Sequence, residues 1–440
     1  MLAVLAAVTE VIKSEGGKET ETEYFAALMT TLDVTTDEAH LAAVLRLLSV
    51  VIKKVPHAVL VSKYSQINSS LLGKLAAASE GGNVSVLRSL LGCLSVLLRL
   101  QPGPVWGLAE TRHSLMSLLS FTAHGKPKLR KAAQHSVVSV VRGSDPDLQP
   151  HPSASVVAGY CCEVVSSSTT QDNTVLYMLT MMREILPVLP RAALKTSCEM
   201  ILKLLSLGSS HLVTTCFSAL HGLLSGRPPL SSLTVEMNAQ LLTALFDFRP
   251  QVHDTAPMVA WLAAMQEALI NLGMNNLDLA SSHLVRYCST ALDCWLSDRS
   301  EVVRAAGVAL GAVMSELGRE VTGGLAGKIV EVVGQGLKYQ YSRAWHTVLA
   351  VLAKTVEVST TKCSSALEFL VNSKSEQPGL ASPGLRCSLG SPDCVCLSLV
   401  VRWRNSICKG AQPEFYLLVF RSWEGRTQTA SHLSSSASLS

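Results

Sequence analysis

Amphipathic helical stretches recur along this chain at a nearly regular interval. Their predicted starts are 37 to 47 residues apart and lie at Leu41, Val84, Pro127, Thr174, His211, Pro257, Val302 and Tyr341. A unit of that length cannot bury its apolar face alone, so neighbouring units must stack along the chain. Stacked units form a curved rod with a long surface and no deep chemical pocket, which favours binding over catalysis.

Within each stretch, apolar side chains return every three or four residues, as on one face of a helix. In KPKLRKAAQHSVVSVV (126–141), the stripe is Leu129, Ala133, Val137 and Val140. DRSEVVRAAGVALGAVMSEL (298–317) repeats the pattern, with Asp298 and Glu301 spaced as in a capping box. Each stretch is therefore predicted to be the second helix of a pair.

Weaker helical patterns precede these second helices. They lie at about 23–32, 64–78, 112–121, 155–165, 194–206, 236–247, 280–296 and 325–338. Two helices in a period of this length are typical of HEAT and armadillo arrays. We predict an all-α, HEAT/armadillo-like α-solenoid of about eight helical hairpins over residues 1–370.

The helical pattern ends after about residue 370. Residues 373–391 are rich in Ser, Gly and Pro, residues 395–420 contain short β-prone segments, and the end of the chain is mostly Ser and Ala. We predict that residues 371–440 are an irregular tail, either disordered or a non-native extension of the array.

Composition narrows the class of protein further. Hydrophobic residues make up 48% of the chain, and its net charge is only +4, so it is not a general polyanion binder. The most apolar stretch, residues 84–100, is interrupted by Arg88 and is too short and too charged to span a membrane. Several of the 12 cysteines, such as Cys93 and Cys216, lie in apolar helical stretches. They are expected to be buried thiols in a reducing compartment.

The sequence offers no convincing chemical site. Residues 323–328 (GGLAGK) resemble a phosphate-binding loop, but Thr322 and Ile329 occupy positions where that loop needs Gly and Ser or Thr. Four cysteines at 387, 394, 396 and 408 lack the paired CxxC spacing of a zinc site. We therefore expect a non-enzymatic protein with no cofactor, no metal and no small-molecule substrate.

One polar cluster stands out from the helical pattern. Lys126, Lys128, Arg130 and Lys131 fall within six residues at a predicted helix start, beside His124. Cations next to the N–H groups of a helix start are suited to phosphate oxygens. The alternative is a solvated turn between helices. Arg46, Lys53 and Lys54 form a second, weaker group.

Particular phrases resemble one known family. They are GGKETETEYFAALMTTLD (16–33), KPKLRKAAQHSVVSVVRGS (126–144), EMNAQLLTALFD (236–247) and GLKYQYSRAWHTVL (336–349). Over residues 1–357, in one continuous order, the chain resembles the amino-terminal half of the ribosomal-RNA-processing twelve-like proteins. Compared with that family, it lacks a lead-in before Met1, later repeats and the Lys- and Glu-rich carboxyl region.

The resemblance implies a scaffold in ribosome biogenesis, acting in rRNA processing and in export of pre-ribosomal subunits. It implies contacts with pre-ribosomal particles, with rRNA, and with nuclear transport factors such as a Ran-type GTPase and karyopherins. It also implies a place in the nucleus and nucleolus, with shuttling to the cytoplasm as an option. The alternative function is a karyopherin-like transport adaptor that binds only proteins.

Overall fold

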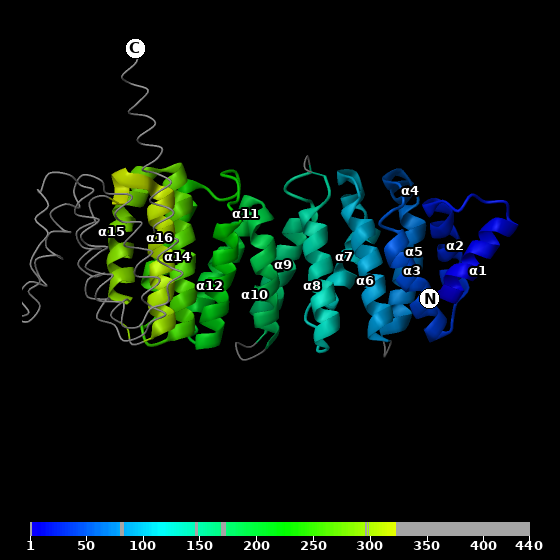
Figure 1. Ribbon diagram of the computed structural model, residues 1–440, viewed down its shortest axis with the longest axis horizontal. Coiled ribbons are helices and arrows are strands. Elements are labelled where there is room, and N and C mark those ends of the chain that lie inside the picture. The colour runs from blue at the N-terminus through cyan, green and yellow to red at the C-terminus, as the bar shows by residue number, and fades with distance from the viewer. Residues whose placement is uncertain are drawn as a thin grey trace, which may run out of the picture.

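The molecule is an elongated stack of helices that lie across its long axis (Figure 1). The computed structural model describes residues 2–322, except 80–82, 146–147, 169–172, 295–296 and 298. In this part of the chain there are sixteen α-helices, two short 3-10 helices and no strands. The all-α solenoid predicted from the sequence is confirmed.

Seven predicted helix pairs are present in the order and places expected. The first helices of these pairs are α2 (Glu21–Val34), α5 (Tyr64–Ser79), α7 (Ala109–Ser120), α9 (Ser153–Ser167), α11 (Arg191–Leu205), α13 (Val235–Asp247) and α15 (Leu277–Cys294). The second helices are α3 (Glu38–Val51), α6 (Val84–Arg99), α8 (Pro127–Arg142), α10 (Asn173–Ile185), α12 (Ser210–Ser225), α14 (Thr255–Asn275) and α16 (Ser300–Thr322). The predicted eighth pair, Asp298 and the tail 371–440 lie outside the described residues.

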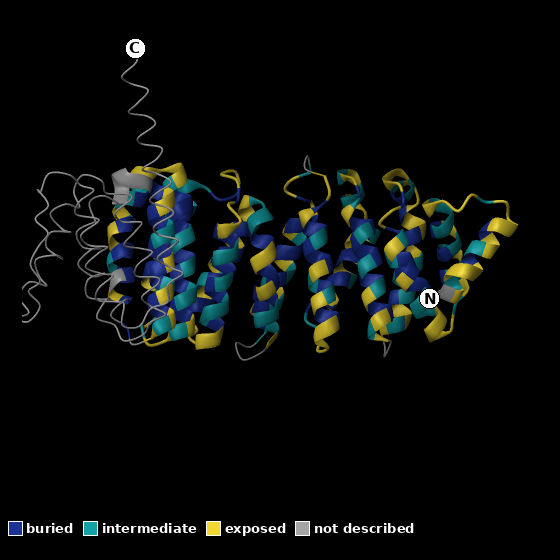
Figure 2. Ribbon diagram, viewed as in Figure 1, coloured by how far each residue is buried: buried dark blue, intermediate teal, exposed yellow. Residues whose placement is uncertain are grey.

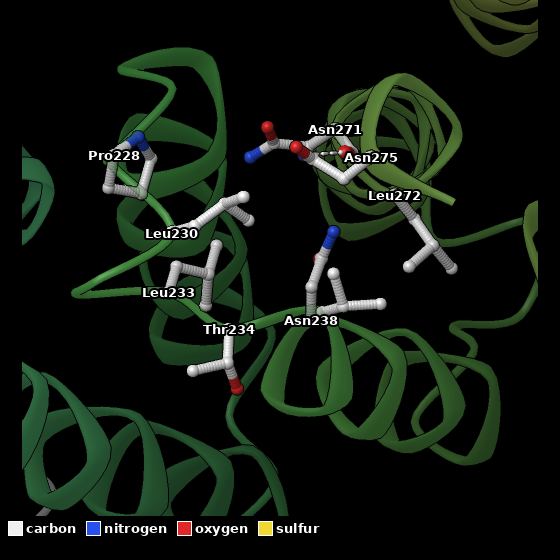
Figure 3. A pocket seen from close by; sticks show the side chains of 9 residues that line it. Pro228, Leu230, Leu233, Thr234, Asn238, Asn271, Leu272 and Asn275 are labelled. Carbon is white, nitrogen blue, oxygen red and sulfur yellow. Dashed lines mark hydrogen bonds between the residues drawn. The ribbon is translucent and has the colours of Figure 1, made fainter. Parts of the chain in front are cut away.

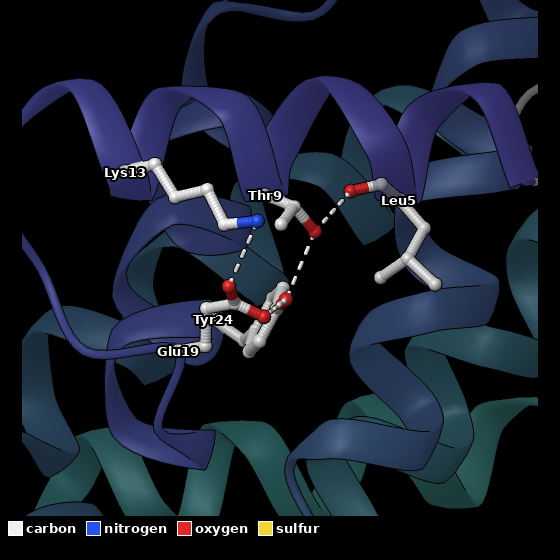
Figure 4. A network of polar contacts seen from close by, with 5 residues as sticks. All are labelled: Leu5, Thr9, Lys13, Glu19 and Tyr24. Atoms are coloured by element: carbon white, nitrogen blue, oxygen red, sulfur yellow. Dashed lines mark hydrogen bonds and ion pairs between the residues drawn. The ribbon is translucent and has the colours of Figure 1, made fainter.

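The chain begins with an extra helix, α1 (Leu2–Ser14), which packs on α2 and α3. The hydroxyls of Thr9 and Tyr24 are 2.9 Å apart, and Lys13 Nζ lies 3.0 Å from a Glu19 carboxylate oxygen (Figure 4). At the start of α2, Thr20 and Glu23 form a capping box. These local contacts fix the angle at which α1 meets the first pair.

The second helices form one continuous row. From α3 to α16 each packs directly against the next, whereas contacts between neighbouring first helices are sparser. The predicted stripe on α8 is fully buried, from Leu129 to Val140, and so is its counterpart on α16 around Leu310. Buried residues run through the whole array without a break (Figure 2). The core is therefore a seam shared by all pairs, as expected for a solenoid.

The two ends of the helices form two different edges of the rod. Turns within a pair, such as residues 121–126 before α8, lie along one edge. Connections between pairs lie along the other and include α4 (His57–Ser62), η1 (Gly103–Gly107), η2 (Leu186–Val188) and the described loop residues 143–145 and 148–152 (Figure 1). We call the second of these the loop edge. The sequence did not predict α4, η1 or η2.

Candidate nucleic-acid interface

The predicted cation cluster lies at the turn between α7 and α8. Lys126 is the N-cap residue of α8, and its side chain makes no capping hydrogen bond. Its backbone N–H donates to Nδ1 of His124 at 3.0 Å, and the His124 ring stacks on Phe121 with centroids 6.0 Å apart. Pro127 occupies the first helical turn, as predicted. The turn is thus held by local contacts that leave the lysine side chains uninvolved.

The four predicted cations divide into two environments. Lys126, Lys128 and Lys131 are exposed, whereas Arg130 is only 9% exposed. Nη1 of Arg130 donates to the carbonyl of His124 at 3.0 Å, and its guanidinium carbon lies 3.6 Å from the centroid of the Tyr177 ring. Tyr177 belongs to α10, so Arg130 joins two neighbouring pairs. The three lysines remain available to a partner.

Further cations extend this surface along the row of second helices. Arg88 is the fifth residue of α6 and Lys131 is the fifth residue of α8, and both are exposed. Arg46 on α3 and Arg183 on α10 are also exposed. Because each helix buries its apolar stripe, these side chains lie on the opposite, outward side. We call Arg46, Arg88, Lys128, Lys131 and Arg183 the basic face.

Acidic residues are nearly absent from the same helices. Neither α6 nor α8 contains Asp or Glu. On α3 the only carboxylate is Glu38, which accepts a hydrogen bond from the backbone N–H of Asn83 at 3.1 Å. On α10 the only carboxylate is Glu184, whose Oε2 lies 2.8 Å from Nη2 of Arg142. The first helices of these pairs carry Glu21, Glu23, Asp33, Glu110 and Glu163. Positive charge is therefore concentrated on the second-helix row.

The basic face ends where acidic residues return to the row. Glu267 lies on α14, and Glu301 and Glu316 lie on α16. At the other end, Lys53 and Lys54 follow α3 and lie on the loop edge, away from the turn before α8. Lys53 and Lys54 are thus separated from the cluster at 126–131. Arg46 lies on the same row of helices as that cluster, with Arg88 of α6 between them. Sequence reasoning did not select Arg88 or Arg183, because each is a single cation in an apolar helix.

A small hollow lies between α13 and α14, with a volume of about 10 Å³, enough for one water molecule (Figure 3). Asn238 Nδ2 donates to the carbonyl of Ala268 at 3.3 Å, and its buried Oδ1 has no partner. Asn271 and Asn275 line the same space. This hollow is too small for a ligand, and we interpret it as a site for a structural water.

The buried thiols in the described helices are expected to be unreactive. Cys93, Cys198 and Cys216 are buried, and burial raises the pKa of each to about 12. A neutral thiol is a poor nucleophile and a poor metal ligand. These cysteines therefore act as small apolar core residues, as the sequence predicted.

Neither a metal-binding cluster nor a membrane-spanning helix is present in the described part of the chain. In that part of the chain no group of three or more His, Cys, Asp or Glu side chains is placed to hold a metal ion. Among the described helices none has the length and hydropathy needed to cross a bilayer. The glycine-rich stretch 323–328 and the four cysteines from 387 to 408 lie outside the described residues.

Comparisons with known proteins give consistent matches. Residues 1–227 match the family model for RRP12-like, N-terminal HEAT repeats. The chain is 42% identical over 371 residues to the RRP12-like protein of Homo sapiens, covering 80% of this chain and 28% of that protein. It is 21% identical over 301 residues to the ribosomal RNA-processing protein 12 of Saccharomyces cerevisiae, covering 61% of this chain and 24% of that protein. The chain thus spans less than a third of these curated relatives.

Solved structures with a similar fold include karyopherins. Importin beta aligns with a TM-score of 0.52 at 12% identity, covering 83% of this chain and 45% of importin beta. Kap121p bound to the SUMO protease Ulp1p aligns with a TM-score of 0.62 at 12% identity, covering 84% of this chain and 37% of Kap121p. Identity this low shows a shared fold alone.

Proposed function

The chain belongs to the RRP12-like family, and from this premise we propose that it is a non-enzymatic scaffold in ribosome biogenesis. One relative is named for ribosomal RNA processing. On this proposal, the chain contributes to processing of rRNA and to export of pre-ribosomal subunits. A stack of helices with one shared seam suits such a role, because it offers a long outer surface for several macromolecules at once.

The observation that supports an RNA contact most directly is the charge distribution along the second-helix row. The five cations of the basic face are exposed, and α6 and α8 carry no carboxylate that would neutralise them. Phosphate contacts need cations at intervals along a surface and do not require a cavity. Lys126, Lys128 and Lys131 lie at the start of α8, in the middle of this row, where the helix dipole adds positive potential.

The remaining parts of the proposal follow from family membership. The partners are pre-ribosomal particles, rRNA, and nuclear transport factors such as karyopherins and a Ran-type GTPase. The site of action is the nucleus and nucleolus, with passage to the cytoplasm during export. Arg130 is excluded from the proposed RNA contact because it is committed to Tyr177 and His124.

The test is a matched pair of charge reversals. Lys126→Glu, Lys128→Glu and Lys131→Glu are combined in one variant of the full chain. The control combines Arg191→Glu, Lys195→Glu and Lys203→Glu, three exposed cations on the first helix α11. Both variants change the net charge equally, so general electrostatics cancel. Affinity for a precursor-rRNA transcript is measured between 50 and 200 mM salt, which is a range in which phosphate contacts weaken steeply.

We expect the α8 variant to lose affinity by at least about tenfold and the α11 variant by about twofold or less. The salt slope of the α8 variant should also be shallower, by about 2 for three lost phosphate contacts to a single strand. Equal affinity and equal slope for both variants would contradict the RNA contact.

A transport adaptor that binds only proteins is the alternative function. Structures with the same fold include Kap121p bound to Pho4p and Kap121p bound to Ulp1p. Under this alternative, neither variant changes RNA binding, while capture of nuclear transport factors depends on one of the two surfaces. Measuring RNA and protein capture on the same variants separates the two functions.

A further inference from the structure

Two lysines continue the outward side of α3 onto the loop edge. The backbone N–H of Lys54 donates to the carbonyl of Val51 at 2.8 Å, so the helical turn persists just past the end of α3. Lys53 follows Arg46 by about two helical turns and therefore lies on the same side of the helix. Both lysines are exposed.

The surface between Arg46 and the two lysines is open. Val50 lies one turn from each and is 58% exposed, so no other element covers this side of α3. Among the described residues, neither Lys53 nor Lys54 uses its side chain in an ion pair or a hydrogen bond. Both ammonium groups are thus available to a partner, as is the guanidinium of Arg46.

The surrounding chain carries almost only positive charge. Residues 39–79, which include most of α3 together with α4 and α5, contain no Asp or Glu. Their cations are Arg46, Lys53, Lys54, Lys63 and Lys74. Of these, Lys74 is committed to two backbone carbonyls at the end of α2. The loop edge next to α3 therefore has a positive potential that no carboxylate of this segment reduces.

A hydrogen bond between α6 and α8 shows which parts of these neighbouring helices lie side by side (Figure 1). The hydroxyl of Ser95 donates to the carbonyl of Ser136 at 3.2 Å. Arg88 precedes Ser95 by seven residues, and Lys131 precedes Ser136 by five. These two cations are therefore at nearly the same level along the parallel helices.

The next step of the row moves toward the loop edge. The backbone N–H of Asn83 donates to a carboxylate oxygen of Glu38 at 3.1 Å, which aligns the starts of α6 and α3. Arg88 is five residues past Asn83, whereas Arg46 is eight residues past Glu38. Arg46 therefore lies about one helical turn nearer the loop edge than Arg88.

The cations on these three helices are evenly spaced. Packed helices lie about 8–10 Å apart, and a helix rises about 1.5 Å per residue. The backbone positions of Lys131, Arg88, Arg46 and Lys53 are consequently about 10 Å from one to the next. We call Lys128, Lys131, Arg88, Arg46, Lys53 and Lys54 the cation track.

This track suits an RNA backbone better than an acidic protein segment. Protein interfaces gain most of their affinity from apolar anchors that become buried. In the described parts of α3, α6 and α8, Val50 is the one large apolar side chain that is exposed. Phosphates require only cations at intervals, and these the track provides.

We propose that Lys53 and Lys54 form a further phosphate-binding site, where the RNA leaves the basic face and crosses onto the loop edge. The RNA runs level from α8 to α6, moves one turn toward the loop edge at Arg46, and reaches the two lysines two turns later. This inference rests on the proposed function and specifies the direction in which the RNA leaves the second-helix row.

The test combines Lys53→Glu and Lys54→Glu in one variant of the full chain. The control combines Lys195→Glu and Lys203→Glu, two exposed cations of α11. The probes are labelled oligouridylates of about 20 and about five nucleotides, and the shorter one has fewer phosphates than the track has cations. It can therefore occupy the α8 end of the track without reaching the loop edge. Binding is followed by fluorescence polarisation at several salt concentrations.

We expect the lysine variant to bind the longer probe at least about fivefold more weakly and the control variant to change its affinity by less than about twofold. Affinity for the shorter probe should change by less than about twofold in both. Because a carboxylate near a helix end is unfavourable, a second variant combines Lys53→Gln and Lys54→Gln. For the longer probe, its salt slope should be shallower by about 1.4, which is about 0.7 for each lost phosphate contact to a single strand. Circular dichroism of each variant checks that it is folded.

The variant with Lys126→Glu, Lys128→Glu and Lys131→Glu separates failure of this inference from failure of the proposed function. If it weakens the longer probe and neither variant of Lys53 and Lys54 does, the loop-edge site is wrong and the RNA contact at α8 stands. Equal losses for both probes in the lysine variant would show that the two lysines do not extend the track. If the longer probe does not bind the wild type, the RNA contact and the loop-edge site both fail.

A polyglutamate of similar length serves as the competing ligand. Tighter binding of polyglutamate than of the longer probe, lost in the variants of Lys53 and Lys54, would assign the two lysines to an acidic protein and overturn the proposal.

Discussion

Arg130 of α8 lies over the ring of Tyr177 of α10, with its guanidinium carbon 3.6 Å from the ring centroid. The same guanidinium donates to the carbonyl of His124 at 3.0 Å. A cation that is desolvated against an aromatic face and hydrogen-bonded to backbone contributes to cohesion of the array. Arg130 therefore joins two repeats, whereas Lys128 and Lys131 of the same cluster are exposed to solvent.

Replacing Arg130 should weaken the boundary between these two repeats. We expect Arg130→Ala to destabilise the folded chain by about 1–3 kcal/mol, through loss of the stacking contact and of the hydrogen bond to His124. Lys131→Ala, at an exposed position on the same turn, should change stability by less than about 0.5 kcal/mol. Thermal unfolding and hydrogen exchange across α8 and α10 provide the measurement. Equal effects of the two substitutions would show that the Tyr177 contact contributes nothing.

The burial of Arg130 agrees with its spacing from the apolar residues of α8. Arg130 precedes Ala133 by three residues and Val137 by seven, so it lies on the same helical side as the apolar stripe, whereas Lys128 and Lys131 do not. The seven described pairs were predictable because each second helix is long enough to show a 3.6-residue period. The six residues of α4 are too few to show one, so this helix could not be predicted from periodicity.

The loop between α8 and α9 contains a buried residue that its composition does not indicate. Residues 143–154 are mostly polar, a composition typical of an exposed loop. In the structure His151 is 2% exposed and its ring meets Trp106 edge-on, with centroids 4.8 Å apart. Contact between segments from different repeats cannot be read from a local pattern. The basic face could not be predicted from the sequence for the same reason, because Arg88 and Lys131 lie on neighbouring helices but are far apart in sequence.

Single neutralisations along the basic face should each reduce the salt dependence of RNA binding. We expect Arg46→Gln, Arg88→Gln and Arg183→Gln each to lower the slope of log affinity against log salt by about 0.7, the value for one phosphate contact to a single strand. Lys195→Gln on α11 is the matched control and should leave the slope unchanged. Affinity titrations at several salt concentrations decide this. If Lys195→Gln lowered the salt slope and Arg88→Gln did not, the RNA would contact the first helices and not the basic face.

Gly222 allows α12 to approach α10 closely. A Cβ at this position would lie 2.4 Å from Cγ of Arg183 and 2.6 Å from its carbonyl oxygen. The carbonyl belongs to helix backbone and cannot move aside, so we expect Gly222→Ala to cost about 1–3 kcal/mol. Gly159→Ala in α9 is the control, because a Cβ there meets no atom within 4 Å. It should stabilise the chain by up to about 1 kcal/mol through helix propensity. Thermal midpoints that shift in the same direction for both variants would argue against the close approach.

His151 should make the stability of the array depend on pH. Burial lowers its pKa to about 4, while an unfolded histidine titrates near 6.5. Between these values the unfolded chain binds the proton and the folded chain does not, so stability is complete above about pH 6.5 and declines as the pH falls toward 4. The loss of stability is roughly 3 kcal/mol at most, because one pKa unit corresponds to about 1.4 kcal/mol. His151→Phe should remove this part of the pH dependence. Ser153→Ala keeps the buried imidazole and should retain it. Unfolding midpoints of both variants at pH 7.5 and pH 5 test the prediction, and a pH dependence that persists unchanged in His151→Phe would assign it to other groups.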